Sequence, residues 1–303
     1  MPRTNIAALR IKRDVWSRSS VGAFIFRTSP ADDAASNGLV GGDANFAFRG
    51  HGVLSAFAAR SSTPGLEGTA HAVGIDGGWE TDRLGLVGAY VDVADSFRAD
   101  MGFVPRTGLK RYRGSIGLGW RPGVLHIRLF FGNDHQYRTD RQGRLQTQIN
   151  ALGPGIIFND GAMLIANWLT NAEGLTEPFE IREGVEIPIG TYRFDQAQVL
   201  YNGDQSRILS FRGSLIVGGF DHGEVHAFNI AGRVRPVDRL TLELEYARNG
   251  IDLPVSDGRF ATNLVIGRAA FAFSSQAFVR ALLQANDDEE EATLAQRFRY
   301  VVV

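Results

Sequence analysis

The chain has 303 residues, of which 44% are hydrophobic, and its formal net charge at pH 7 is −1. This balance excludes the basic footprint of a nucleic-acid-binding protein and the composition of a disordered chain. The absence of cysteine excludes disulfides, thiolate metal sites and cysteine nucleophiles. No apolar run approaches the about 18 residues of a membrane-spanning helix, so only a closed β-barrel could carry this chain through a membrane.

Arginine supplies nearly all of the positive charge. Lys12 and Lys110 are the only lysines among 32 basic residues. The guanidinium group forms bidentate pairs with carboxylates, so this bias suits a ladder of ion pairs inside a pore. A genome with GC-rich codons would produce the same bias, and the composition does not separate the two explanations.

The first third of the chain is typical of paired extended segments. Polarity alternates around residues 9–11, as it does in a strand with two different faces. Short turns are expected at Ser17–Ser20 and Thr81–Arg83. The polar, Gly-rich segment Ser29–Asp43 is expected to be a surface loop.

The clearest hairpin lies between Gly102 and Tyr137. Its two strands meet at the turn Arg121–Gly123, and both alternate in polarity. One face carries Tyr112, Ile116, Leu118, Trp120, Leu125, Ile127, Leu129 and Phe131, and the other carries Arg111, Arg113, Ser115, His126, Arg128 and Phe130. One face suits hydrocarbon and the other suits water, which indicates a pair of transmembrane β-strands.

The same alternation continues to the end of the chain. Residues 144–150 place a row of arginine and amide side chains on one face, where a dry core would not accept them. Residues 240–246 alternate leucine or tyrosine with threonine or glutamate. Asn171–Gly190 is expected to be the longest and most acidic loop, and the last strand ends in three valines.

These elements predict an all-β fold, an antiparallel up-and-down transmembrane β-barrel. We expect about 16–18 strands in a single domain over residues 1–303, with short turns alternating with longer loops. A soluble β-sandwich or β-propeller is the alternative. Strands of about ten residues are long for a sandwich, and the sequence contains no propeller repeat.

Both ends indicate that the natural polypeptide is longer and that the barrel in this chain is incomplete. The first 16 residues lack the apolar core of a secretory signal, which an outer-membrane protein needs. A final strand without a partner would leave an exposed apolar edge, and bacterial single-chain barrels have an even number of strands. We therefore expect at least one more strand after Val303.

Three segments resemble a bacterial family called domain of unknown function 5916. They are RDVWSRSSVGA at Arg13–Ala23, GFVPRTGLKRYRGSIGLGWRPG at Gly102–Gly123 and QRFRYVVV at Gln296–Val303. Members of that family resemble outer-membrane barrels that commonly follow a domain similar to carbohydrate-binding module family nine. The resemblance implies a cell-surface protein without an established activity, and it carries over no catalytic residue.

The polar residues of the alternating strands are the candidate functional residues, because basic rings favour anions in a pore. The candidates for lining the lumen are Arg10, Arg111, Arg113, His126, Arg128, Arg144, Gln146, Gln148, Arg212, Glu243, Glu245, Arg280, Arg297 and Arg299. The alternative is that these arginines pair with Asp14, Asp195, Glu243 and Glu245 and only fill the lumen.

Motifs for catalysis are weak. Glu243 and Glu245 share a face, as a glycosidase pair could, but neighbouring arginines favour ion pairs instead. Ser115 and His126 are not directly opposite in the expected register and lack a G-x-S-x-G elbow. The acidic run Asp287–Glu291 lacks the spacing of an EF-hand and indicates a solvated loop. We predict no catalytic residue, cofactor or metal site.

The expected function follows from the expected architecture. We expect a protein of the bacterial outer membrane, in contact with outer-membrane lipid, that acts as a pore or conduit for saccharides or other small solutes. A cell-surface anchor for a carbohydrate-binding domain and an envelope hydrolase are the alternatives. No nucleic-acid partner is expected, and the sequence gives neither the solute nor the oligomeric state.

Overall fold

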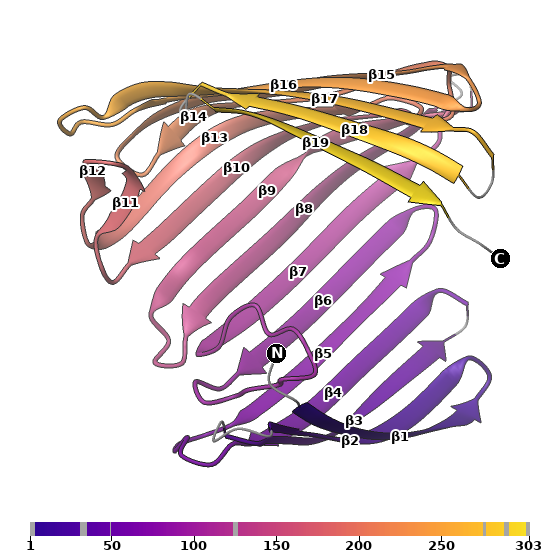
Figure 1. The fold of residues 1–303 in the computed structure, drawn as a ribbon, viewed down its shortest axis with the longest axis vertical. Helices are drawn as coiled ribbons and strands as arrows, with labels where there is room; N and C mark the ends of the chain where they lie inside the picture. The colour runs from indigo at the N-terminus through magenta and orange to yellow at the C-terminus, as the bar shows by residue number, and fades with distance from the viewer. Residues whose placement is uncertain are drawn as a thin grey trace. The chain divides into compact units, whose positions relative to one another are not determined.

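The computed structural model describes residues 4–30, 35–48, 50–123, 127–274, 277–287 and 291–300, the last range by its backbone alone. These ranges contain 19 strands and no helix, and 17 of the strands form one antiparallel, up-and-down sheet (Figure 1). The predicted all-β class and strand number are confirmed. No strand pairing in the described residues closes the sheet into a barrel, and no helix there is long and apolar enough to cross a membrane.

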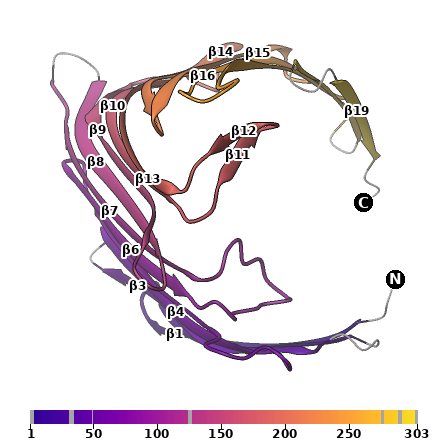
Figure 2. The same ribbon diagram turned by 90° about the vertical axis from the view of Figure 1, so that its left-hand side faces the viewer.

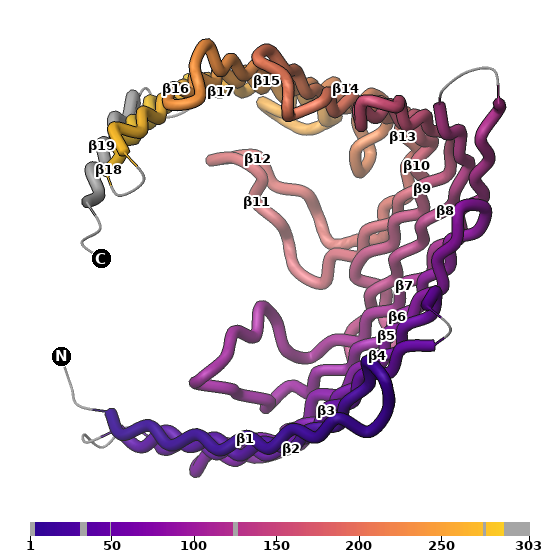
Figure 3. Tube along the Cα trace, turned by 90° about the vertical axis from the view of Figure 1, so that its right-hand side faces the viewer, coloured from indigo at the N-terminus to yellow at the C-terminus, as the bar shows by residue number. Residues whose placement is uncertain are grey.

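The chain divides into two compact units. Unit 1 comprises Met1–Gly119 and Gly132–Asn150, and unit 2 comprises Trp120–Phe131 and Ala151–Val303. In unit 1, β1 to β7 each pair with the next strand along the chain (Figure 3). The first nine strands are β1 (Thr4–Trp16), β2 (Ser19–Pro30), β3 (Asn37–Phe48), β4 (Gly52–Ser62), β5 (His71–Glu80), β6 (Leu84–Val93), β7 (Leu109–Trp120), β8 (Ile127–Asp140) and β9 (Leu145–Phe158).

Unit 2 repeats the same order of pairing. Strand β10 pairs with β13, and each strand from β13 to β18 then pairs with the next. A small hairpin, β11–β12, is inserted between β10 and β13 (Figure 2). The strands are β10 (Met163–Leu175), β11 (Phe179–Arg182), β12 (Val185–Ile187), β13 (Gly190–Asn202), β14 (Leu209–Phe220), β15 (Gly223–Val237), β16 (Leu240–Asp252), β17 (Arg259–Ala272), β18 (Ala277–Asn286) and β19 (Glu291–Tyr300).

The predicted alternation of short turns and longer loops holds from β1 to β7 in unit 1. Residues 17–18 and 81–83 connect strands at one end of the unit, whereas 63–70 and 94–108 connect them at the other. In unit 2 the alternation is weaker, because residues 221–222 make a tight turn at the end where a long loop is expected. Asp221 in that turn has φ of 50°, as Asp and Asn accept more readily than most residues.

The expected loop Ser29–Asp43 is largely strand, because β3 begins at Asn37. Its glycines misled the prediction, since glycine is unfavourable in strands unless a neighbour approaches closely. At Gly41 a Cβ atom would lie 2.5 Å from Cζ of Phe24 on β2 and 2.6 Å from the carbonyl oxygen of Ala58 on β4. The phenyl ring of Phe24 therefore fills the place that a side chain at Gly41 would take.

The expected long loop Asn171–Gly190 is also wrong in part. Strand β10 continues to Leu175, and residues 179–187 form the β11–β12 hairpin. Val185 and Ile187 are only 2% and 1% exposed and pack with Leu253 from the β16–β17 loop. They are the most deeply buried large side chains in the part of the chain that the structure describes. Packing against other elements thus folds a segment whose composition indicates a loop.

Alternation along the strands gives each unit two different faces. We call the face with Arg10 and Arg113 in unit 1, and with Arg212 and Glu243 in unit 2, the polar face. The opposite, apolar face of unit 2 carries large exposed side chains, and Leu215, Ile230 and Leu244 are 45%, 53% and 62% exposed there. Its outward row on β14–β16 also includes Phe211, Phe228 and Leu242.

Aromatic side chains gather on the apolar face of unit 1 where β1 and β3 end in short turns. Trp16 is 70% exposed, and Trp120, the residue of β7 at which unit 2 begins, is 51% exposed. The ring centroid of Trp16 lies 5.6 Å from that of Phe46, which is 6.4 Å from that of Phe48. These rings form a first aromatic row.

A second aromatic row crosses the same face nearer the long loops. The ring of Tyr112 lies 5.0 Å from that of Tyr90 on β6 and 6.2 Å from that of Tyr137 on β8, measured between centroids. Along β7, exposed Ile116 and Leu118 lie between this row and the first. The apolar face of unit 1 is thus an apolar band with aromatic residues on both sides.

Candidate functional site

The polar face of unit 2 carries two carboxylates shared between two guanidinium groups. Glu243 and Glu245 lie two residues apart on β16 and so point to the same face. Arg212 Nη2 donates to Glu243 Oε1 at 3.1 Å and to Glu245 Oε2 at 3.0 Å. Arg268 Nη1 donates to the same two oxygens, at 3.0 Å for Glu245. Asn229 Nδ2 donates to Glu245 Oε1 at 2.8 Å.

The strand register assembles this Arg–Glu cluster. Arg268 on β17 stands directly opposite Glu243. Arg212 on β14 reaches across β15, where Ala231 stands opposite both Arg212 and Glu245 and leaves room for the longer side chain. The alternative that arginines of this face pair with Glu243 and Glu245 is confirmed for Arg212. Arg268 is not among the candidate residues named from the sequence. Pairing the alternating segment before the β16–β17 loop with the one after it would have placed Arg268 beside Glu243.

Two ion pairs occupy the polar face of unit 1. Arg10 Nη2 donates to both carboxylate oxygens of Asp43, at 2.8 Å and 3.0 Å. Arg113 donates to Asp134 Oδ2 from Nη2 at 2.8 Å and from Nε at 3.0 Å. Arg10 thus pairs with Asp43 of β3, which is not among the four carboxylates expected as partners of the arginines, because Gly22 on the intervening β2 has no side chain in the way.

The amide row lies where the alternation predicts, but Arg144 does not belong to it. Gln146, Gln148 and Asn150 share one face of β9 by alternation, and Gln146 Oε1 is buried without a hydrogen-bond partner in the described residues. Arg144 precedes β9 and closes the β8–β9 turn by donating from its backbone N–H to Asp140 Oδ1 at 2.8 Å. Its role is that of a turn residue.

The other predicted arginines of unit 2 are only partly placed. Arg128 has a buried Nε atom with no hydrogen-bond partner in the described residues. The guanidinium carbon of Arg280 lies 5.0 Å from the ring centroid of Phe278. In the backbone register Arg297 stands opposite Arg280 and Arg299 opposite Phe278, and the side chains of β19 are not described.

The remaining chemical candidates lie partly outside the described residues. His126 lies outside the described residues, so its expected distance from Ser115 is not tested, and residues 288–290 of the acidic run also lie outside them. Within the described ranges no group of three or more histidine or carboxylate side chains could hold a metal ion.

A cavity of about 650 Å³ lies in unit 1 beneath residues 94–108, the β6–β7 loop. The loop is fixed to the strands through its polar groups. Arg98 donates its backbone N–H to Ser61 Oγ at 3.0 Å and accepts from Asn37 Nδ2 at 3.0 Å. Thr28 Oγ1 donates to Asp100 Oδ2 at 3.1 Å. The cavity is therefore covered by an anchored loop.

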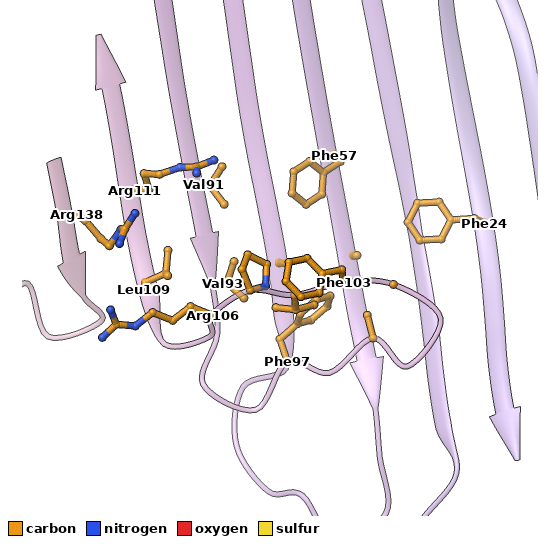
Figure 4. A pocket seen from close by; sticks show the side chains of 16 residues that line it. Phe24, Phe57, Val91, Val93, Phe97, Phe103, Arg106, Leu109, Arg111 and Arg138 are labelled. Atoms are coloured by element: carbon orange, nitrogen blue, oxygen red, sulfur yellow. The ribbon is translucent and has the colours of Figure 1, made fainter. Parts of the chain in front are cut away.

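The lining of this cavity joins apolar residues to three arginines. Arg106 comes from the loop, Arg111 from β7 and Arg138 from β8 (Figure 4). The apolar part consists mainly of Phe24, Phe57, Val91, Val93, Phe97, Phe103 and Leu109. Sequence reasoning placed Arg111 on the polar face but missed the cavity, because the folding of residues 94–108 onto the strands has no periodic signal.

Comparison with protein-family models gives no match for this chain, and comparison with curated proteins gives none. The likeness to the family called domain of unknown function 5916 therefore stays a prediction.

Proposed function

We propose that this chain forms part of the wall of a β-barrel in a bacterial outer membrane. The observation that carries the proposal is the apolar face of unit 1, where exposed aliphatic side chains lie between two aromatic rows. Along the single strand β7, Tyr112 of unit 1 and Trp120, where unit 2 begins, are separated by about 26 Å at the usual rise per residue. The apolar band of outer-membrane barrels is about 25 Å tall and is flanked by aromatic girdles.

The energetics of the apolar face supports the same proposal. Each large apolar side chain gains about 1.5–3 kcal/mol on full transfer from water to an apolar environment. Leu244 and Ile230 on unit 2 remain more than half exposed in the chain by itself. Acyl chains would cover such residues without a second protein layer, whereas a soluble sheet would need one.

A matched pair of substitutions tests contact with lipid. Leu215 and Ser214 are neighbours in the middle of β14 and point to opposite faces. Leu215→Arg is expected to weaken folding into phospholipid vesicles by about 2–4 kcal/mol, because arginine is costly against the centre of a bilayer. Ser214→Arg, with the same added charge on the polar face, is expected to cost much less. Equal costs for the two variants would contradict the proposal.

On the polar side we propose a conduit for small polar solutes. The support is the set of paired charges and amides of the polar face, such as Arg10 with Asp43 and Arg212 with Glu243, which suit a water-filled lumen. Planar-bilayer recording of the full chain is expected to show stepwise conductance. A protein that inserts into the bilayer but stays silent would contradict the conduit.

One observation favours a second candidate, a non-conducting surface anchor. In unit 1 the loop 94–108 packs on the polar face, and in unit 2 the β11–β12 hairpin does so through Tyr192, Phe220 and Phe260. Segments placed there would narrow a lumen. The bilayer recording separates the candidates, because an anchor inserts without conducting and deletion of residues 176–189 would then raise the conductance.

A further inference from the structure

The cavity under the β6–β7 loop has an apolar floor made by strand register. Ala59 on β4, Ala72 on β5, Val93 on β6 and Leu109 on β7 stand opposite one another in succession, and all four are buried. Two of them are alanines, and the loop spans the hollow that these small side chains leave. A volume of about 650 Å³ is within the range of about 300–1,000 Å³ usual for small-molecule sites.

One side of the cavity carries the positive charge of three arginines. Arg106, Arg111 and Arg138 have no carboxylate partner among the described residues. Their neighbours differ, because Arg113 pairs with Asp134 at 2.8 Å and Arg141 pairs with Asp92 at 2.7 Å. The Nε atom of Arg138 is buried and lacks an acceptor in the described residues.

The aromatic rings lie on the other side of the cavity. Figure 4 shows the guanidinium groups of Arg106, Arg111 and Arg138 at one side and the rings of Phe57 and Phe103 away from them. A ligand that satisfies this arrangement needs an acidic head for the donors and an apolar body for the rings. Arginine is well suited to such a head, since its planar fork matches a carboxylate with two parallel hydrogen bonds.

We propose that this cavity binds a small organic anion with an aromatic or aliphatic body. The carboxylate of the ligand accepts hydrogen bonds from Arg111 and Arg138, and its body lies against Phe57, Phe97 and Phe103. A cation is repelled by the three arginines. A sugar is disfavoured because most of its hydroxyl groups would face side chains that cannot hydrogen-bond, which is costly inside a protein.

The proposal does not depend on membrane transport, because every lining residue belongs to unit 1 and no conductance is involved. The test uses the purified full chain in a neutral, sugar-headed detergent. Three probes of one shape, 2-naphthoate, 2-naphthylmethanol and protonated 2-naphthylmethylamine, are titrated by calorimetry, and empty micelles give the background. Naphthoate is expected to bind at least about tenfold more tightly than the other two.

The double variant Arg111→Gln/Arg138→Gln is expected to lose at least about tenfold in naphthoate affinity and to keep its affinity for the neutral alcohol. Arg113→Gln removes the same charge from the same strand at a paired position, and it is expected to bind naphthoate nearly as the unchanged chain does. Far-ultraviolet circular dichroism of each variant confirms that the strands are kept. Equal binding of all three probes, or an equal loss in the double variant and in Arg113→Gln, would overturn the proposal.

Discussion

At the residue scale, the Arg–Glu cluster of unit 2 ties three strands together. Glu243 and Glu245 on β16 share their oxygens between Arg212 on β14 and Arg268 on β17. Both carboxylates are largely covered, with side chains 15% and 18% exposed. Bonds to charged groups in such places contribute more than bonds between exposed ions.

The cluster gives a prediction for stability. Glu245→Gln keeps the shape of the side chain but removes the charge that accepts from Arg212, Arg268 and Asn229, so the free energy of unfolding is expected to fall by about 1–3 kcal/mol. Urea unfolding in lipid vesicles measures it. The control is Glu224→Gln, at a side chain that is 74% exposed and 4.0 Å from His226, where a change within about 0.5 kcal/mol is expected. Equal effects at the two sites would contradict the prediction.

Asp221 in the β14–β15 turn gives a prediction for pH. Burial raises the pKa of its carboxyl above the ordinary value of 3.8, and nearby His222 only partly opposes this. The pKa of Asp221 is therefore higher in the folded chain than in the unfolded chain. At a pH above both of these pKa values the carboxylate is charged, and its burial destabilises the fold. This loss of stability disappears when the pH falls below the ordinary carboxyl pKa of 3.8, because the group is then protonated in both states.

Asp221→Asn removes the charge and keeps a residue that accepts the positive φ of the turn. The variant is expected to be more stable than the unchanged chain at neutral pH, and the gain is expected to vanish at about pH 3. Urea midpoints at the two pH values measure the difference. A gain of the same size at both values would mean that the charge of Asp221 is not the cause.

The ion pairs of the polar face show which contacts between single residues can be predicted from the sequence. The pairing of Arg212 with Glu243 could be expected, because alternation places both on the polar face. Arg10 with Asp43 could not, because it depends on the register of β1–β3 and on the missing side chain at Gly22. Alternation fixes the face of a residue, whereas register fixes its neighbour.

At the scale of elements, the β11–β12 hairpin depends on packing. Val185 and Ile187 bury their side chains against Leu253 and partly buried neighbours such as Phe220 and Phe260. The sequence of this segment is acidic, and its alternating runs, Phe179–Arg182 and Val185–Ile187, are only four and three residues long, so its composition indicates a loop. The same limit applies to β3, where Phe24 of the neighbouring strand compensates for Gly41.

A pair of truncations tests whether packing holds the hairpin. Ile187→Ala removes a buried side chain, and the hairpin is expected to detach, because such a cavity costs about 2–5 kcal/mol. Limited chymotrypsin digestion is expected to cut near Phe179 at least about tenfold faster, since exposed backbone is cleaved first. Ile189→Ala, at a position 62% exposed, is the control and is expected to leave the rate unchanged. Equal rates in the two variants would show that the hairpin is held by other contacts.

At the scale of the whole molecule, strict alternation over long segments made the all-β class and the number of strands predictable. The antiparallel order followed as well, because consecutive segments joined by short connections pair with each other. The cavity of unit 1 could not be predicted. It arises where a loop without periodicity covers a row of buried residues, two of them alanines, that four different strands bring together.

The most direct test of the account asks what covers each face of a strand. The chain has no cysteine, so Leu215→Cys and Ser214→Cys each accept a single nitroxide label in the full chain folded into lipid vesicles. We predict that the label at residue 215 collides mainly with oxygen dissolved in the bilayer and the label at residue 214 mainly with a water-soluble nickel complex. A label at residue 215 that is shielded from both, or reached mainly by nickel, would contradict a lipid-facing apolar side.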